Sequence, residues 1–76
     1  MTLLDRITIE PGKMDGQPCI RGMRLTVRRV VEIVADYKNL AEIRKDYPDL
    51  EDEDIRQALL YAAAAVEDRT DELAEA

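Results

Sequence analysis

The chain contains no histidine, no tryptophan and no phenylalanine, and it has a single cysteine. Zinc sites in proteins are built from cysteine and histidine ligands at short spacing, so no metal site is expected. The same absences remove the commonest general base and the Ser-His and Cys-His nucleophile pairs. We therefore expect a protein that is not an enzyme and that needs no cofactor.

Cys19 stands alone, which excludes an intrachain disulfide. We interpret it as a small buried hydrophobic residue in a reducing compartment; a bridge between two copies is the alternative. Residues 1–10 lack the basic segment and long apolar run of a signal peptide. The longest apolar run, which ends at Val66, is far shorter than the ~20 residues that span a bilayer. These features predict a cytoplasmic protein.

Charge is abundant but unevenly distributed. Charged side chains make up 37% of the 76 residues, and the net charge is −6. Residues 1–48 hold nine lysines and arginines against seven acids, whereas residues 49–76 hold two against ten. The N-terminal part could therefore contact a polyanion that the C-terminal part would repel.

The length allows one domain, which we place at residues 1–66 with a β element in residues 1–25. Residues 67–76 are predicted to form an acidic C-terminal tail. The alternation in residues 7–9 predicts a short strand, and a second extended stretch is expected around residues 19–25. A domain this small buries only about 60% of its unfolded surface. Because open strand edges also invite pairing, we expect a homodimer.

Apolar spacing and capping residues predict three helices. The first covers about residues 27–37 and follows Thr26, whose hydroxyl can cap it. The second covers about 40–47 and follows Asn39, another good cap. The third is expected from about residue 52 to at least residue 66.

Residues three and four positions apart define the faces of these helices. The expected core consists of Val30, Val34, Ile43, Ile55 and Leu59. Ala62 and Val66 would continue the inner face of the third helix. Other apolar residues lie off these stripes or on the first strand. They are the expected dimer contacts, namely Ile7, Ile9, Leu60 and Tyr61.

A short helix, a tight turn and a longer helix are typical of a helix-turn-helix, although any three-helix bundle has this pattern. The third helix opens with four carboxylates, residues 51–54, which would oppose phosphate contacts. Their simpler interpretation is that acids complement the dipole at a helix N-terminus. If DNA is bound, the expected contacts are Arg21, Arg24, Arg28 and Arg29. The alternative is that these arginines form a solvated face with one structural member.

The most distinctive stretch is GQPCIRGMRL, residues 16–25, which contains Gly16, Pro18 and Gly22. It follows an RITI strand at residues 6–9 and precedes a valine-rich helix. Two later motifs are DYPDL at residues 46–50 and EDIRQALLYA at residues 53–62. Together, over about residues 5–66, these motifs resemble the family catalogued as domain of unknown function 433.

The resemblance implies a mainly α protein with a three-helix, homeodomain-like helix-turn-helix fold. It also implies an antitoxin-type protein that neutralises a cognate PIN-like ribonuclease toxin, with its own operator DNA as a further ligand. Glu51 stands where family members commonly have a threonine or serine cap, which would weaken the cap. The alternatives are a DNA-binding transcriptional regulator without a toxin, and a plain dimerisation or adaptor module.

Residues 67–76 are the part of the chain least able to form a core, and we expect them to bind the toxin. An acidic segment would suit the basic, RNA-binding rim of a PIN-like nuclease, with Leu73 as an anchor. Arg69, the only arginine in this segment, would suit the carboxylate centre of such an enzyme. The alternative is that the tail only aids solvation and the folded body blocks the toxin.

Overall fold

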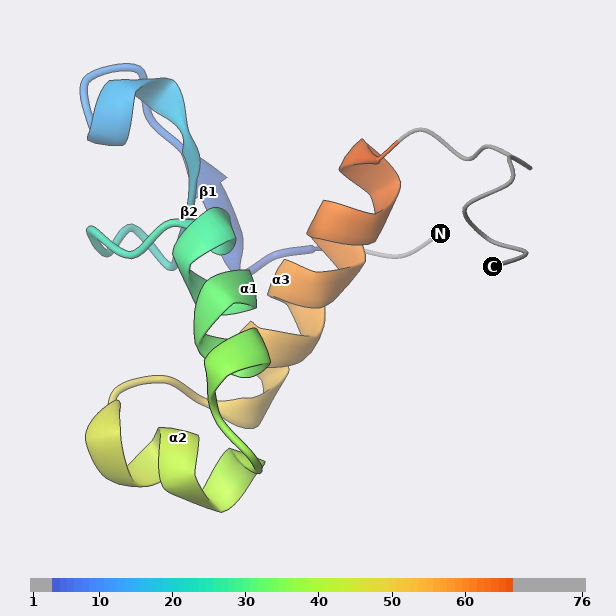
Figure 1. The fold of residues 1–76 in the computed structure, drawn as a ribbon. Coiled ribbons are helices and arrows are strands. Elements are labelled where there is room, and N and C mark those ends of the chain that lie inside the picture. Colours follow the sequence, from blue (N-terminus) through green and yellow to red (C-terminus); the bar gives the residue numbers. More distant parts are fainter. Residues whose placement is uncertain (1–3, 67–76) are drawn as a thin grey trace, which may run out of the picture.

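Three helices and a two-stranded antiparallel hairpin make up residues 4–66, the part of the chain that this computed structural model describes (Figure 1). In chain order, the elements are β1 (Ile7–Ile9), the 3-10 turn η1 (Met14–Gly16), β2 (Pro18–Ile20), α1 (Val27–Asp36), α2 (Leu40–Asp46) and α3 (Asp52–Ala65). The predicted fold class, mainly α with a short N-terminal β element, is confirmed. The expected acidic tail, residues 67–76, lies outside the described residues.

The helices begin where capping chemistry predicts. The Thr26 hydroxyl accepts a hydrogen bond from the backbone N–H of Arg29 at 3.1 Å, at the start of α1. The Asn39 side-chain oxygen accepts from the N–H of Glu42 at 2.9 Å, at the start of α2. Figure 1 shows the hairpin and α2 at opposite ends of α1, with α3 packed against α1. α3 also packs against β1.

The second extended stretch is shorter than predicted. In the hairpin, Ile7 pairs with Ile20 and Ile9 pairs with Pro18. The chain then turns at once, because Arg21 and Gly22 have φ angles of 45° and 72°. Two successive left-handed residues are typical of a primed hairpin turn, and glycine adopts this conformation at little cost. The extended conformation expected around residues 19–25 is therefore wrong for residues 21–24. The chain pairs with β2 again after this turn, because the N–H of Ile20 donates to the carbonyl oxygen of Leu25 at 2.9 Å and Cys19 bridges Thr26.

The core is formed by apolar residues from β2, all three helices and the turn between α2 and α3. Its buried members include Ile20, Val27, Val30, Ile33, Ile43, Leu50, Ile55 and Ala58. The prediction is thus confirmed for Val30, Ile43 and Ile55, whereas Val34 is half-buried against this core. Leu59 was expected inside but is 40% exposed, and Val66 is 70% exposed.

The start of α3 explains why the predicted burial of Leu59 is wrong. Its buried residues are Asp54, Ile55, Gln57 and Ala58, so two polar side chains lie on the inner face. Both make hydrogen bonds to the N-terminal part of the chain. The helix is therefore turned away from the purely apolar stripe, and Leu59 lies on the outer side. Among the described residues, no helix is both long and apolar enough to cross a membrane.

Candidate macromolecular interfaces

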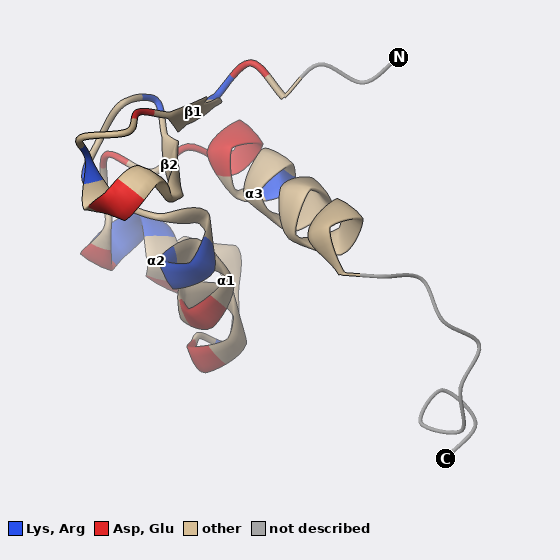
Figure 2. Ribbon diagram, turned by 90° about the horizontal axis from the view of Figure 1, so that it is seen from above, with Lys and Arg blue, Asp and Glu red and all other residues tan. Residues whose placement is uncertain are grey.

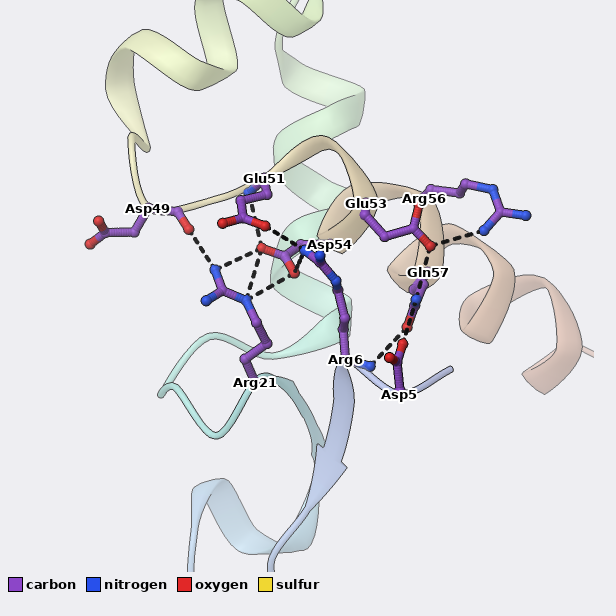
Figure 3. Close-up of polar contacts among 9 residues, drawn as sticks. All are labelled: Asp5, Arg6, Arg21, Asp49, Glu51, Glu53, Asp54, Arg56 and Gln57. Atoms are coloured by element: carbon purple, nitrogen blue, oxygen red, sulfur yellow. Dashed lines mark hydrogen bonds and ion pairs between the residues drawn. The ribbon is translucent and has the colours of Figure 1, made fainter. Parts of the chain in front are cut away.

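Asp54 is fully buried, and its carboxylate is enclosed by two arginines (Figure 3). Arg21 binds it in a bidentate manner, with Nε 3.0 Å from Oδ1 and Nη2 2.9 Å from Oδ2. Arg6 Nη1 donates to Oδ1 at 3.0 Å, and the backbone N–H of Glu51 donates to Oδ2 at 2.9 Å. Charge-assisted hydrogen bonds of this kind are stronger than neutral ones, so the cluster attaches the hairpin firmly to α3.

The electrostatics of this Asp54 cluster favour the charged carboxylate. Burial alone would raise the pKa of Asp54, but the hydrogen bonds from Arg21, the Glu51 N–H and Arg6 outweigh it and hold the pKa below its usual range. Arg21 Nη2 also donates to the carbonyl oxygen of Asp49 at 2.8 Å. These contacts fix Arg21 in its left-handed conformation, which a non-glycine residue rarely adopts.

Gln57 forms a second attachment between α3 and the N-terminal segment. Its Oε1 accepts from the backbone N–H of Arg6 at 2.9 Å, and its Nε2 donates to Asp5 Oδ1 at 2.9 Å. Nε2 also lies 2.9 Å from Glu53 Oε2, and this hydrogen bond is the largest cause of the lowered pKa of Glu53. Asp54 and Gln57 thus hold β1 on the first two turns of α3 (Figure 3).

The acidic start of α3 is therefore neutralised within the molecule. The carboxylates of Asp54 and Glu53 have the partners described above. Glu51 Oε1 lies 2.6 Å from Arg6 Nη1, and Asp52 Oδ2 lies 2.6 Å from Arg44 Nη2. Among residues 4–66, no group of three or more acids is placed to hold a metal ion. This end of α3 supports the hairpin, and its charges face arginines of the same chain.

The sequence did not identify Arg6 and Gln57 as residues that attach the N-terminal segment to α3. A signal was present, since Asp54 and Gln57 lie three positions apart, on the helix face that also carries Ala58. Polar side chains on an inner face need partners, because an unsatisfied buried polar group is costly. The partners came from more than 30 positions away, as the separation of 33 between Arg21 and Asp54 shows.

Three of the predicted DNA contacts, Arg24, Arg28 and Arg29, gather near the start of α1, and we call them the basic patch. They line a hollow of about 450 Å³ together with Met14, Gln17, Thr26 and Glu32. Arg28 and Arg29 lie 3.5 Å and 3.4 Å from Glu32 carboxylate oxygens, yet their side chains are 82% and 51% exposed. Arg21, the fourth predicted contact, lies instead in the Asp54 cluster.

A second hollow, the open groove, lies between α1 and the C-terminal half of α3. It has a volume of about 380 Å³, and its apolar lining includes Pro18, Val27, Val31, Tyr61, Ala62 and Val66. Tyr61 and Ala62 continue the inner face of α3 beyond the end of the core, and Val66 follows the last residue of the helix. The open groove is therefore an apolar cleft in which the core side of α3 is only partly covered.

The outer side of α3 carries a separate apolar surface. Leu59 and Leu60 are 40% and 38% exposed there, and a hollow of about 430 Å³ lies beside them. Val34, Leu40 and Ile55 contribute to the lining of this hollow. Figure 2 shows that α3 carries charged residues mainly in its first turns and is uncharged further along.

The predicted dimer and toxin contacts do not form one surface. Ile7 is half-buried against the core, whereas Ile9 on β1 is 56% exposed. Leu60 lies on the outer side of α3, and Tyr61 lines the open groove. The predicted toxin contacts, Arg69 and Leu73, lie outside the described residues.

Comparison with known proteins places these features in a family. Residues 7–62 match the family described as protein of unknown function (DUF433). The chain belongs to the DUF433 family. The match covers both strands, α1, α2 and most of α3, so it includes the basic patch, much of the open groove and the Asp54 cluster except Arg6. No curated protein and no solved structure matches the chain.

Proposed function

We propose that this DUF433 protein is a non-catalytic, antitoxin-type protein that neutralises a PIN-like ribonuclease toxin. The family description assigns no function, and the observation that carries the proposal is the open groove. It is lined mainly by apolar side chains, although the chain as a whole is highly charged. Concave apolar surfaces with a polar rim are the usual places for protein partners to dock.

The position of the open groove also supports the proposal. Val66, which is 70% exposed, lies at its edge and directly precedes the acidic residues 67–76 in the sequence. A partner seated in the groove would therefore be within reach of this segment. Leu73 would add an apolar anchor, and Arg69 would approach the carboxylates that hold Mg²⁺ in a nuclease of this type.

Co-expression with a PIN-like ribonuclease encoded beside this gene tests the proposal. The chain should copurify with the toxin and restore growth, and Val66→Asp should abolish both effects. Leu40→Asp is the matched control, because Leu40 is also an exposed apolar residue but lies beside the outer side of α3. Neutralisation that survives Val66→Asp, or fails only with Leu40→Asp, would place the toxin contact elsewhere.

A shortened chain separates the two segments of the proposed toxin contact. A chain that ends at Val66 lacks Arg69 and Leu73 but retains all the described residues that line the open groove. We expect this chain to bind the toxin more weakly and to neutralise it poorly. Undiminished neutralisation would show that the folded body blocks the toxin without the acidic segment.

Binding to operator DNA is a second candidate function, and the basic patch favours it. Arg28 and Arg29 follow the Thr26 cap, so they project from a helix N-terminus, where phosphate binding is favourable. The acids at the start of α3 hold the nearby arginines in ion pairs, so this end of the helix offers few free cations to DNA phosphates. The basic patch is therefore the surface we assign to DNA backbone contacts in this proposal.

Fluorescence anisotropy with the chain's own promoter DNA tests this second candidate. Arg28→Gln with Arg29→Gln should weaken binding and reduce its dependence on salt, by a slope of about 0.9 for each lost phosphate contact. Arg44→Gln with Arg56→Gln is the control, because these arginines lie outside the basic patch. Equal effects of the two double variants would show non-specific attraction. DNA binding without any toxin partner would instead favour a plain transcriptional regulator.

A further inference from the structure

The outer side of α3 combines large and small uncharged side chains in a particular order. Leu59 and Leu60 come first, and Ala63 and Ala64 follow one turn later on the same side of the helix. All four are exposed. We call these four residues the leucine face, and the hollow lined by Val34 and Leu40 extends it toward α1 and α2.

The leucine face is unusual for this molecule. Ten consecutive residues, Gln57 to Val66, carry no charge, although 37% of the chain is charged. Exposed apolar residues that occur singly need no explanation, but a contiguous apolar face on a small domain marks an interaction site. This face has a different direction from the open groove, because Tyr61 and Ala62 line the groove from the inner side of α3.

We propose that the leucine face binds a second copy of this chain through antiparallel packing of the two α3 helices about a two-fold axis. A two-fold interface must be complementary to itself. With the axis near residues 61 and 62, Leu60 of each copy lies over Ala63 of the other, and Leu59 lies over Ala64. Each large side chain therefore meets a small one. Parallel packing would instead place leucine on leucine and alanine on alanine.

Electrostatics allows the same occupant and favours the same direction. Two copies that each carry a net charge of −6 repel one another, and an uncharged face lets them meet where this repulsion is least. Antiparallel packing also brings Arg56, which is 62% exposed, toward the C-terminal end of the partner helix. A cation is favoured there, because the last carbonyl groups of a helix carry partial negative charge.

Sedimentation equilibrium of the full chain at about 5–500 µM, a range around common dimer affinities, tests the association. The wild type should be a dimer, and Leu60→Lys should raise its dissociation constant by about 100-fold, because the substitution buries an unpaired charge in each copy. Ile9→Lys is the matched control, since Ile9 is exposed on β1. A monomeric wild type, or a dimer that only Ile9→Lys disrupts, would overturn the proposal.

Crossed disulfides test the orientation. In a Cys19→Ala background, a mixture of Leu60→Cys and Ala63→Cys chains should oxidise to a heterodimer faster than either variant forms its own dimer. The reason is that antiparallel packing brings positions 60 and 63 of different copies within disulfide reach. Faster formation of the two homodimers would indicate parallel packing and overturn the proposal. Neither assay involves toxin or DNA, so the result is independent of the proposed function.

Discussion

Replacing Asp54 with asparagine tests whether the buried carboxylate holds the hairpin on α3. The side chain keeps its shape, whereas Arg6 and Arg21 lose the charge that they enclose. Removing one partner of a buried ion pair costs about 3–5 kcal/mol. Because both arginines keep contact with water, we expect a loss of about 2–3 kcal/mol. A domain of this length has roughly 4–11 kcal/mol in total, so the variant should fold with little reserve.

Urea unfolding followed by circular dichroism at pH 7 measures this loss. Asp52→Asn is the matched control, because it makes the same substitution two residues earlier in α3. Its ion pair with Arg44 has side chains that are 55% and 53% exposed, so its loss should be clearly smaller. Equal losses in the two variants would refute the reasoning, because burial of Asp54 would then have no special effect.

The same comparison as a function of pH gives a second check. The pKa of Asp54 is lower in the folded state than the value of about 3.9 expected in an unfolded chain. Its contribution to the free energy of unfolding is therefore complete above the unfolded pKa and is lost as the pH falls through the folded pKa. The wild type should lose more stability than Asp54→Asn below about pH 4. Parallel acid profiles would contradict the assigned role.

Three further predictions concern other residues. Ile55→Ala should lower the free energy of unfolding by about 2–4 kcal/mol and Leu59→Ala by about 1 kcal/mol or less, because only Ile55 is buried; urea unfolding compares them. Gly22→Ala should cost about 1 kcal/mol in thermal unfolding, because its φ of 72° is left-handed. The Tyr37 hydroxyl donates to Asp46 at 2.6 Å, which together with burial raises its pKa to about 12. An ultraviolet titration should show this late ionisation, and Tyr37→Phe should remove it.

The helices could be predicted from the sequence because local signals determine where they begin. Thr26 and Asn39 cap their helices as expected, and the predicted ends differ from the observed ones by about one residue. For α3 the expected weak cap is compensated locally, since the carboxylate of Asp54 accepts from the N–H of Glu51. The caps at Thr26 and Asn39 span only three residues, so they can be recognised from the sequence.

The inner face of α3 and the end of β2 could not be predicted in this way. Both depend on Arg21, whose left-handed backbone turns the chain and whose side chain reaches Asp54. A pattern of apolar spacing treats Asp54 and Gln57 as outward residues, because it contains no information on partners elsewhere in the chain. The same limit applies to the predicted DNA contacts. Their common charge suggested one surface, but the structure separates Arg21 from the basic patch.

The attachment of β1 to α3 has a consequence for how the protein is made. The hydrogen bonds from Arg6 to Asp54 and Gln57 join residues 48 and 51 positions apart. A ribosome produces the hairpin well before it produces α3, and a two-stranded hairpin alone is at best marginally stable. The nascent N-terminal part therefore has no stable partner until the last helix emerges. We expect chains that stop before Asp52 to be unfolded and rapidly degraded, so that a lasting molecule requires the synthesis of α3.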